Sequence, residues 1–139
     1  MELKTAKDSQ HIYKEKNNCV LQKKIDYLRL KNSERIYQCL VDFVQEEHWN
    51  DILVILYMES RGDSLAFNGQ DYGAMQINKV HIKSGIAVKD SLFYMDYNIK
   101  TAYNKIFVKW CLKDYKNRFK RYNGSMVYQK KAEKLLETL

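Results

Sequence analysis

Proline is absent from this sequence of 139 residues, and glycine occurs only five times. Because both residues interrupt regular helices, their scarcity beside abundant Lys, Glu, Leu and Ile favours helices over a many-stranded sandwich. Apolar residues make up 45% of the chain and charged residues 29%, which excludes a low-complexity or disordered protein. We therefore expect a mainly α fold, and the length suits one domain with its own hydrophobic core.

Long apolar runs are also missing. No stretch approaches membrane-spanning length, and residues 1–18 lack the apolar segment of a signal peptide. The three cysteines, Cys19, Cys39 and Cys111, have neither the clustering of a zinc site nor the even number of a disulfide framework. We interpret them as small buried or half-buried thiols, and we predict no metal and no cofactor.

The net charge of +7 indicates an acidic partner. Nucleic acid, an anionic lipid surface and an anionic cell-wall polymer would all fit, and charge alone does not choose among them. Part of the charge comes from a run rich in Lys and Arg at residues 113–121. We interpret this run as a solvated helix face that helps to attract the acidic partner.

The spacing of apolar residues divides the chain into an N-terminal segment and a main domain. Residues 1–32 begin polar and mixed in charge, and we expect an arm or a helix there. Residues 33–139 would form the main domain. Its first helix has apolar residues at helical spacing, and Asn32 or Ser33 is available to cap the first turn.

A second helix is expected at the unbroken apolar run from Ile52 to Met58. By periodicity alone the run fits a buried helix or a buried strand, but the preceding Asn50 and Asp51 are of the capping type, which favours a helix. Further helices should follow Asn98 and Ser125, and we interpret these two residues as their caps.

Residues 61–85 form the one long stretch without helical periodicity, and they contain four of the five glycines. Long irregular segments in compact domains are more often functional than accidental. We therefore expect this loop, which could include a short hairpin, to border a cleft.

Glu59 is the first candidate for chemistry because it lies between the apolar run and this polar loop. A carboxyl group held against apolar surroundings loses the hydration that favours its charged form, so its pKa rises. It can then stay protonated near neutral pH and act as a general acid. Cleavage of a glycosidic bond needs such an acid.

Four ordered blocks surround this candidate: MES at 58–60, DYGAMQIN at 71–78, DYNI at 96–99 and RYNGS at 121–125. In order and spacing they resemble the lysozyme-like lytic transglycosylases and, more distantly, the goose-type lysozymes. The DYGAMQIN and DYNI blocks are most similar to the small transglycosylases that accompany secretion systems and pili. The resemblance covers residues 48–136 and implies a lysozyme-like catalytic domain within residues 33–139.

The resemblance implies that Glu59 is the catalytic acid. Ser60 matches the neighbour that helps to hold the local geometry, and we include it among the candidate substrate-binding residues. Gly73 matches the glycine that allows a close turn at the floor of the cleft.

Four further residues match the family's sugar-binding positions. Met75 and Gln76 correspond to the pair whose side chains line the sugar subsites, where an amide can donate to and accept from acetamido and hydroxyl groups. Tyr122 corresponds to the aromatic residue that faces the acid, with a hydroxyl that could bond to the carboxyl or the sugar. Its neighbour Asn123 is a further binding candidate, or only the end of a helix.

The expected reaction is cleavage of the β-1,4 bond between N-acetylmuramic acid and N-acetylglucosamine in peptidoglycan. In the transglycosylase route the product ends in a 1,6-anhydro ring, and no second carboxylate is required. The alternative is hydrolysis, as in a phage endolysin, with Asp63 or Asp71 as a second acid. Asn78 stands where a goose-type lysozyme has an acid, which favours the transglycosylase.

Two other classes of protein remain as alternatives: a basic helical nucleic-acid-binding protein and a glycan-binding module without catalysis. No convincing recognition helix is visible, so we expect no nucleic-acid partner. We expect a monomer acting on glycan strands in the periplasm or cell wall. Because no export signal is visible, a secretion apparatus, a virion or a phage lysis system would have to deliver it, unless a leader has been removed.

Overall fold

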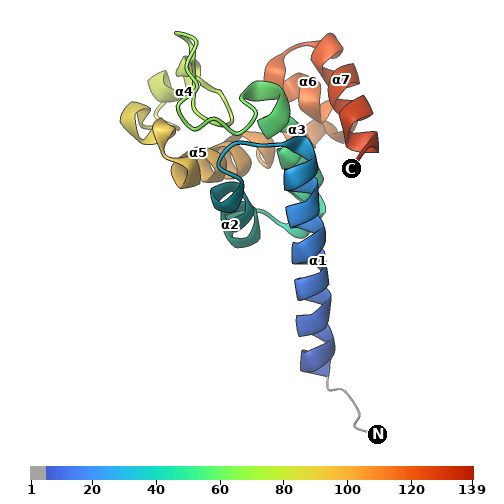
Figure 1. Cartoon of the computed structure of the whole chain (residues 1–139). Helices are drawn as coiled ribbons and strands as arrows, with labels where there is room; N and C mark the ends of the chain where they lie inside the picture. The colour runs from blue at the N-terminus through green and yellow to red at the C-terminus, as the bar shows by residue number, and fades with distance from the viewer. Residues whose placement is uncertain (1–5) are drawn as a thin grey trace, which may run out of the picture.

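Helices make up most of the part of the chain that the computed structural model describes, residues 6–139 (Figure 1). This confirms the prediction of a mainly α fold. The α-helices are α1 (Ala6–Leu28), α2 (Ser33–Phe43), α3 (Trp49–Glu59), α4 (Lys79–Lys83), α5 (Met95–Thr101), α6 (Arg118–Asn123) and α7 (Met126–Glu137). The 3₁₀ turns are η1 (Glu46–His48), η2 (Lys89–Phe93) and η4 (Cys111–Asn117), while η3 (Ala102–Phe107) is a π-helical turn that continues α5. No helix in residues 6–139 is long and apolar enough to span a membrane.

Helix α3 lies in the hydrophobic core. Every residue from Ile52 to Leu56 is fully buried, because α1 and α7 both pack against this helix. A helix that is apolar all round is stable only when neighbours cover all of its faces. The unbroken apolar run is therefore a buried helix, as predicted, and it presents Glu59 at its C-terminal end.

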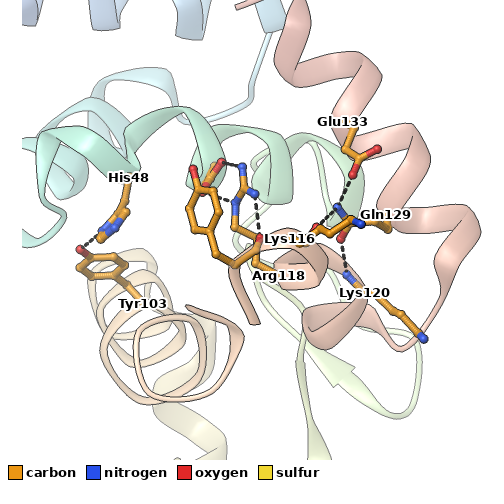
Figure 2. Close-up of polar contacts among 9 residues, drawn as sticks. His48, Tyr103, Lys116, Arg118, Lys120, Gln129 and Glu133 are labelled. Carbon is orange, nitrogen blue, oxygen red and sulfur yellow. Dashed lines mark hydrogen bonds and ion pairs between the residues drawn. The ribbon is translucent and has the colours of Figure 1, made fainter. Parts of the chain in front are cut away.

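The predicted cap of α3 is wrong. The helix already begins at Trp49, so Asp51 lies within its first turn, where it is buried. The guanidinium of Arg118 donates to both of its carboxylate oxygens, at 2.7 and 3.0 Å. Arg118 is itself buried, so residues 113–121 are not simply a solvated face (Figure 2). The ion pair fastens the start of α6 to the start of α3.

Helix α1 extends well beyond the rest of the molecule at its N-terminal end (Figure 1). It is continuous over 23 residues, and its last turns bury Leu21, Ile25 and Leu28 in the core. The core of residues 33–139 is therefore completed by part of the N-terminal segment. Cys19 is exposed on this helix, contrary to the prediction, whereas Cys39 and Cys111 are buried.

The irregular segment contains a short antiparallel hairpin, in which β1 (Asp71–Tyr72) pairs with β2 (Ile77–Asn78). Asp71 lies opposite Asn78 and Tyr72 opposite Ile77. The side chain of Asn78 also caps α4 by accepting the backbone N–H of Val80 at 3.0 Å. The hairpin and α4 thus form one connected unit beside the end of α3.

Asn98 fixes the hairpin and does not cap a helix as predicted. It lies inside α5 and is fully buried. Its Oδ1 accepts the N–H of Met75 at 2.8 Å, and its Nδ2 donates to the carbonyls of Tyr72 and Leu92 at 2.9 Å. Gly73 has a φ of +77°, and a Cβ there would lie 2.3 Å from both Asn98 Nδ2 and the Leu92 carbonyl. Only glycine fits this turn without displacing the amide.

The other predicted caps have different outcomes. Ser125 caps α7, because its Oγ accepts the N–H of Tyr128 at 3.3 Å. Asn32 occupies the position before α2 but makes no side-chain cap; its amide donates to the Gly62 carbonyl at 3.0 Å. Asn32 therefore joins the start of α2 to the loop that follows α3.

Candidate active site

A cleft of about 360 Å³ opens where α3, the hairpin and the end of α6 meet. It brings together three of the four sequence blocks, although these are far apart along the chain. The residues that line it are Glu59, Asp71, Gln76, Ile77, Asn78, Val80, His81, Ile106, Arg121, Tyr122, Asn123 and Gly124. The predicted catalytic acid thus shares one cleft with four of the other predicted site residues.

Glu59 has the protonation behaviour of a general acid. Burial raises its pKa from the ordinary value of 4.5 to about 7, and the negative charge of Asp71 adds to the increase. A side-chain hydrogen bond with Asn123 acts in the opposite direction. Near neutral pH a substantial fraction of Glu59 therefore carries the proton that a departing glycosidic oxygen would need.

Asp71 is the second carboxylate of the cleft. Its Oδ1 accepts the amide of Asn78 at 2.8 Å, and its Oδ2 accepts the amide of Asn68 at 2.9 Å. Two donors on one carboxylate fix its orientation and stabilise its negative charge. The two acids therefore have different surroundings. Glu59 is desolvated and has few hydrogen-bond donors around it, whereas each oxygen of Asp71 accepts a hydrogen bond.

Tyr122 and Asn123 end α6 beside Glu59. The hydroxyl of Tyr122 donates to the Met75 carbonyl, so its proton is not given to Glu59. Burial and the charge of Glu59 raise the pKa of Tyr122 well above 10, and the phenol remains neutral. Asn123 is more than the end of a helix, because its side chain lines the cleft and acts to lower the pKa of Glu59.

The Met-Gln pair contributes to the cleft unequally. The side chain of Met75 is fully buried and outside the cleft, so the prediction that it lines a sugar subsite is wrong. Gln76 lines the cleft, but its Nε2 already donates to the carbonyls of Ala66 and Gly73 at 3.1 and 2.9 Å. Its Oε1 remains to accept a hydrogen bond from a sugar.

Ser60 and Asp63 also lie outside the lining of the cleft. Ser60 Oγ donates to the Ala74 carbonyl at 2.6 Å and accepts the Gly62 N–H at 3.1 Å. It therefore fastens the end of α3 to the hairpin, which makes it a positioning residue and not a substrate contact. Asp63 accepts the N–H of Leu65 within its own loop, and the structure does not bring it into the cleft with Glu59.

Two cleft residues were missed by sequence reasoning: His81 on α4 and Arg121 on α6. Burial lowers the pKa of His81 below its ordinary value of 6.5, so its imidazole is neutral at pH 7. A lone histidine in a short helix carries no recognisable signal. Arg121 is directly beside Tyr122 in the RYNGS block, and that adjacency was the one signal available.

The C-terminal wall of the cleft is held in place by Gln129 of α7 (Figure 2). This buried amide accepts the N–H of Lys120 at 2.8 Å and donates to the Lys116 carbonyl at 3.1 Å. It also donates to Glu133 at 2.8 Å. Because both ends of the amide are used, α6 is fixed against α7 next to the residues that face Glu59.

No family model matches this sequence, and no significant match was found among curated proteins or solved structures. Within residues 6–139, no group of three or more Cys, His, Asp or Glu side chains is arranged to hold a metal ion. The chemical interpretation therefore depends on the side chains of the cleft itself. They include one protonated acid, one oriented carboxylate, a guanidinium, an imidazole, a phenol and several amide groups.

Proposed function

We propose that this protein cleaves the glycan strands of peptidoglycan at the β-1,4 bond between N-acetylmuramic acid and N-acetylglucosamine. The observation that carries the proposal is the pKa of Glu59, about 7, in a cleft that also contains Gln76, Tyr122 and Asn123. A protonated carboxyl among amide and hydroxyl groups matches the needs of glycosidic cleavage.

In the proposed reaction, Glu59 gives its proton to the bridging oxygen while positive charge develops on the muramic acid ring. The leaving strand departs with that proton. In the transglycosylase route the sugar's own acetamido group supports the charge. Glu59, now ionised, then removes a proton from the 6-hydroxyl, which closes a 1,6-anhydro ring and restores the acid.

Hydrolysis is a second candidate, and the position of Asp71 favours it. From the sequence, Asn78 counted against hydrolysis because an amide stood where a goose-type lysozyme has an acid. In the structure, Asn78 instead holds Asp71 in the cleft. Asp71 could stabilise the developing positive charge or orient a water molecule, which are the tasks of the second carboxylate in glycosidases.

The test is digestion of purified sacculi followed by mass spectrometry of the soluble fragments. Release of muropeptides is expected from the wild-type protein, and no release under conditions in which the protein is folded would contradict the proposed function. Ends that are lighter by one water identify the transglycosylase route. Reducing muramic acid ends identify hydrolysis and make Asp71 the next residue to replace.

A further inference from the structure

The net positive charge of this protein comes from its C-terminal part. Residues 100–139 contain 11 Lys and Arg against three Asp and Glu, whereas residues 1–99 contain 13 against 14. Most of these basic side chains are exposed on the surface of η3 to α7, including Lys109, Lys113, Lys116 and Lys120. Arg121 is the member of this group that lines the cleft.

Arg121 is held in place without a carboxylate partner. Its guanidinium carbon lies 4.2 Å from the centre of the Trp110 ring, and its Nη1 donates to the Trp110 carbonyl at 3.1 Å. In the described part of the chain, no Asp or Glu lies within ion-pair distance of it. Four of its five N–H donors therefore remain for a ligand.

A stacked guanidinium with free donors is suited to binding a carboxylate, because its planar fork is already oriented and little side-chain freedom is lost on binding. A peptidoglycan strand carries carboxylates on its peptides, or on the lactyl ether where the peptide has been removed. A neutral glycan of the same β-1,4 linkage carries none. We propose that Arg121, stacked on Trp110, selects carboxylate-bearing glycan strands over neutral ones. This inference rests on the proposed function, since the cleft must hold a glycan.

The test measures binding in a Glu59→Gln background, so that the ligand is not cleaved. Two ligands are compared by calorimetry: soluble peptidoglycan strands with their peptides, and the same strands with every carboxylate coupled to methylamine. Arg121→Gln should weaken binding of the native strands roughly tenfold or more and leave binding of the amidated strands unchanged. For the Glu59→Gln parent, amidation of the strands should weaken binding by at least the same factor, because it also removes the general attraction between the strands and the basic surface.

Two further variants separate the specific contact from general charge. Lys134→Gln removes one charge from the same region but from a residue outside the cleft lining, and it should bind both ligands as the parent does. Arg121→Lys keeps the charge without the planar fork and should fall between parent and Arg121→Gln. If Arg121→Gln weakens the binding of native and amidated strands equally, the role of Arg121 is merely structural and the inference is overturned. Unchanged binding of the native strands would overturn it as well.

Failure of this inference differs from failure of the proposed function. If the wild-type protein releases muropeptides but Arg121→Gln keeps the parent's preference for native over amidated strands, only the selection by Arg121 is wrong. If the protein binds native strands through Arg121 but releases nothing, the cleavage is wrong and the selection stands. Absence of both release and binding would overturn both.

Discussion

Helix α3 carries a carboxyl group near each end, buried at Asp51 and half-buried at Glu59, and the two groups face different neighbours. Asp51 in the first turn meets the guanidinium of Arg118 with both oxygens. Glu59 in the last turn meets an amide and the negative charge of Asp71. The same element thus supplies a paired charge that joins helices and an unpaired acid whose pKa is near 7. The neighbours, not the helix, determine which carboxyl can perform chemistry.

The largest expected effect comes from replacing the acid at the C-terminal end. Glu59→Gln keeps the shape of the side chain but removes its proton, so release of muropeptides should fall by roughly two to four orders of magnitude. The measurement is the initial rate of turbidity loss of purified sacculi. A folded variant with near-normal clearing would show that another residue is the acid.

The same variant should change the pH dependence of stability. Because the folded state raises the pKa of Glu59 to about 7, this group's contribution to stability is present below pH 4.5 and is lost as the pH rises through 7. Glu59→Gln should therefore melt higher relative to wild type at pH 8 than at pH 4. An equal difference at both pH values would contradict a desolvated carboxyl.

At the other end of α3, Asp51→Asn should affect stability and leave the acid intact. It leaves the buried guanidinium of Arg118 without its counter-charge, which costs about 3–5 kcal/mol of unfolding free energy. Urea unfolding measures this loss. As a control, Asp51→Leu combined with Arg118→Met should lose less than Asp51→Asn, because two apolar side chains leave no unpaired charge. A larger loss in the double variant would show that packing, not charge, governs this site.

A smaller effect is expected where the two acids of the cleft interact. Activity of the wild-type protein should fall as the pH rises through about 7, because Glu59 loses its proton. Asp71→Asn removes a charge that raises this pKa, so the fall should move to lower pH. The rate at the optimum should survive in a transglycosylase and be lost in a hydrolase. An unchanged midpoint would mean that Asp71 does not influence Glu59.

The smallest expected effect concerns two tyrosines beside Glu59. Tyr122→Phe removes the hydrogen bond to Met75, so we expect about 1 kcal/mol less stability and a fall in turnover of up to about tenfold. Tyr128→Phe is the matched control, since its buried hydroxyl has no hydrogen-bond partner in the described residues. Thermal melts measure the stability of the two variants, and rate assays measure their turnover. Equal losses in both variants would refute a specific role for the Tyr122 hydroxyl.

The sequence predicted the parts of this molecule that depend on local pattern. The unbroken apolar run predicted that α3 is buried, and the position of Glu59 directly after this run predicted where the acid meets the cleft. Gln76, Tyr122 and Asn123 were found through short ordered blocks. The end of the helical spacing predicted an irregular segment at residues 61–85, for which a short hairpin was one possibility.

Features that depend on distant contacts could not be predicted. Asp51 and Arg118 are separated by 67 positions, and a capping position explained Asp51 equally well. Asn98 likewise resembles a helix cap until the carbonyls that it bonds are known. Met75 belongs to the DYGAMQIN block, but the structure of the hairpin places its side chain in the core. Burial and register follow from packing, which a single sequence does not specify.

The distribution of the thiols makes the protein suitable for selective labelling. Burial is the main cause that raises the pKa of both Cys39 and Cys111 to about 12, so neither forms a reactive thiolate at neutral pH. Cys19 is exposed on α1, on the side near Tyr37 of α2. A maleimide dye or spin label should therefore attach there without any mutation. It would report whether this projecting helix changes its surroundings when glycan strands enter the cleft.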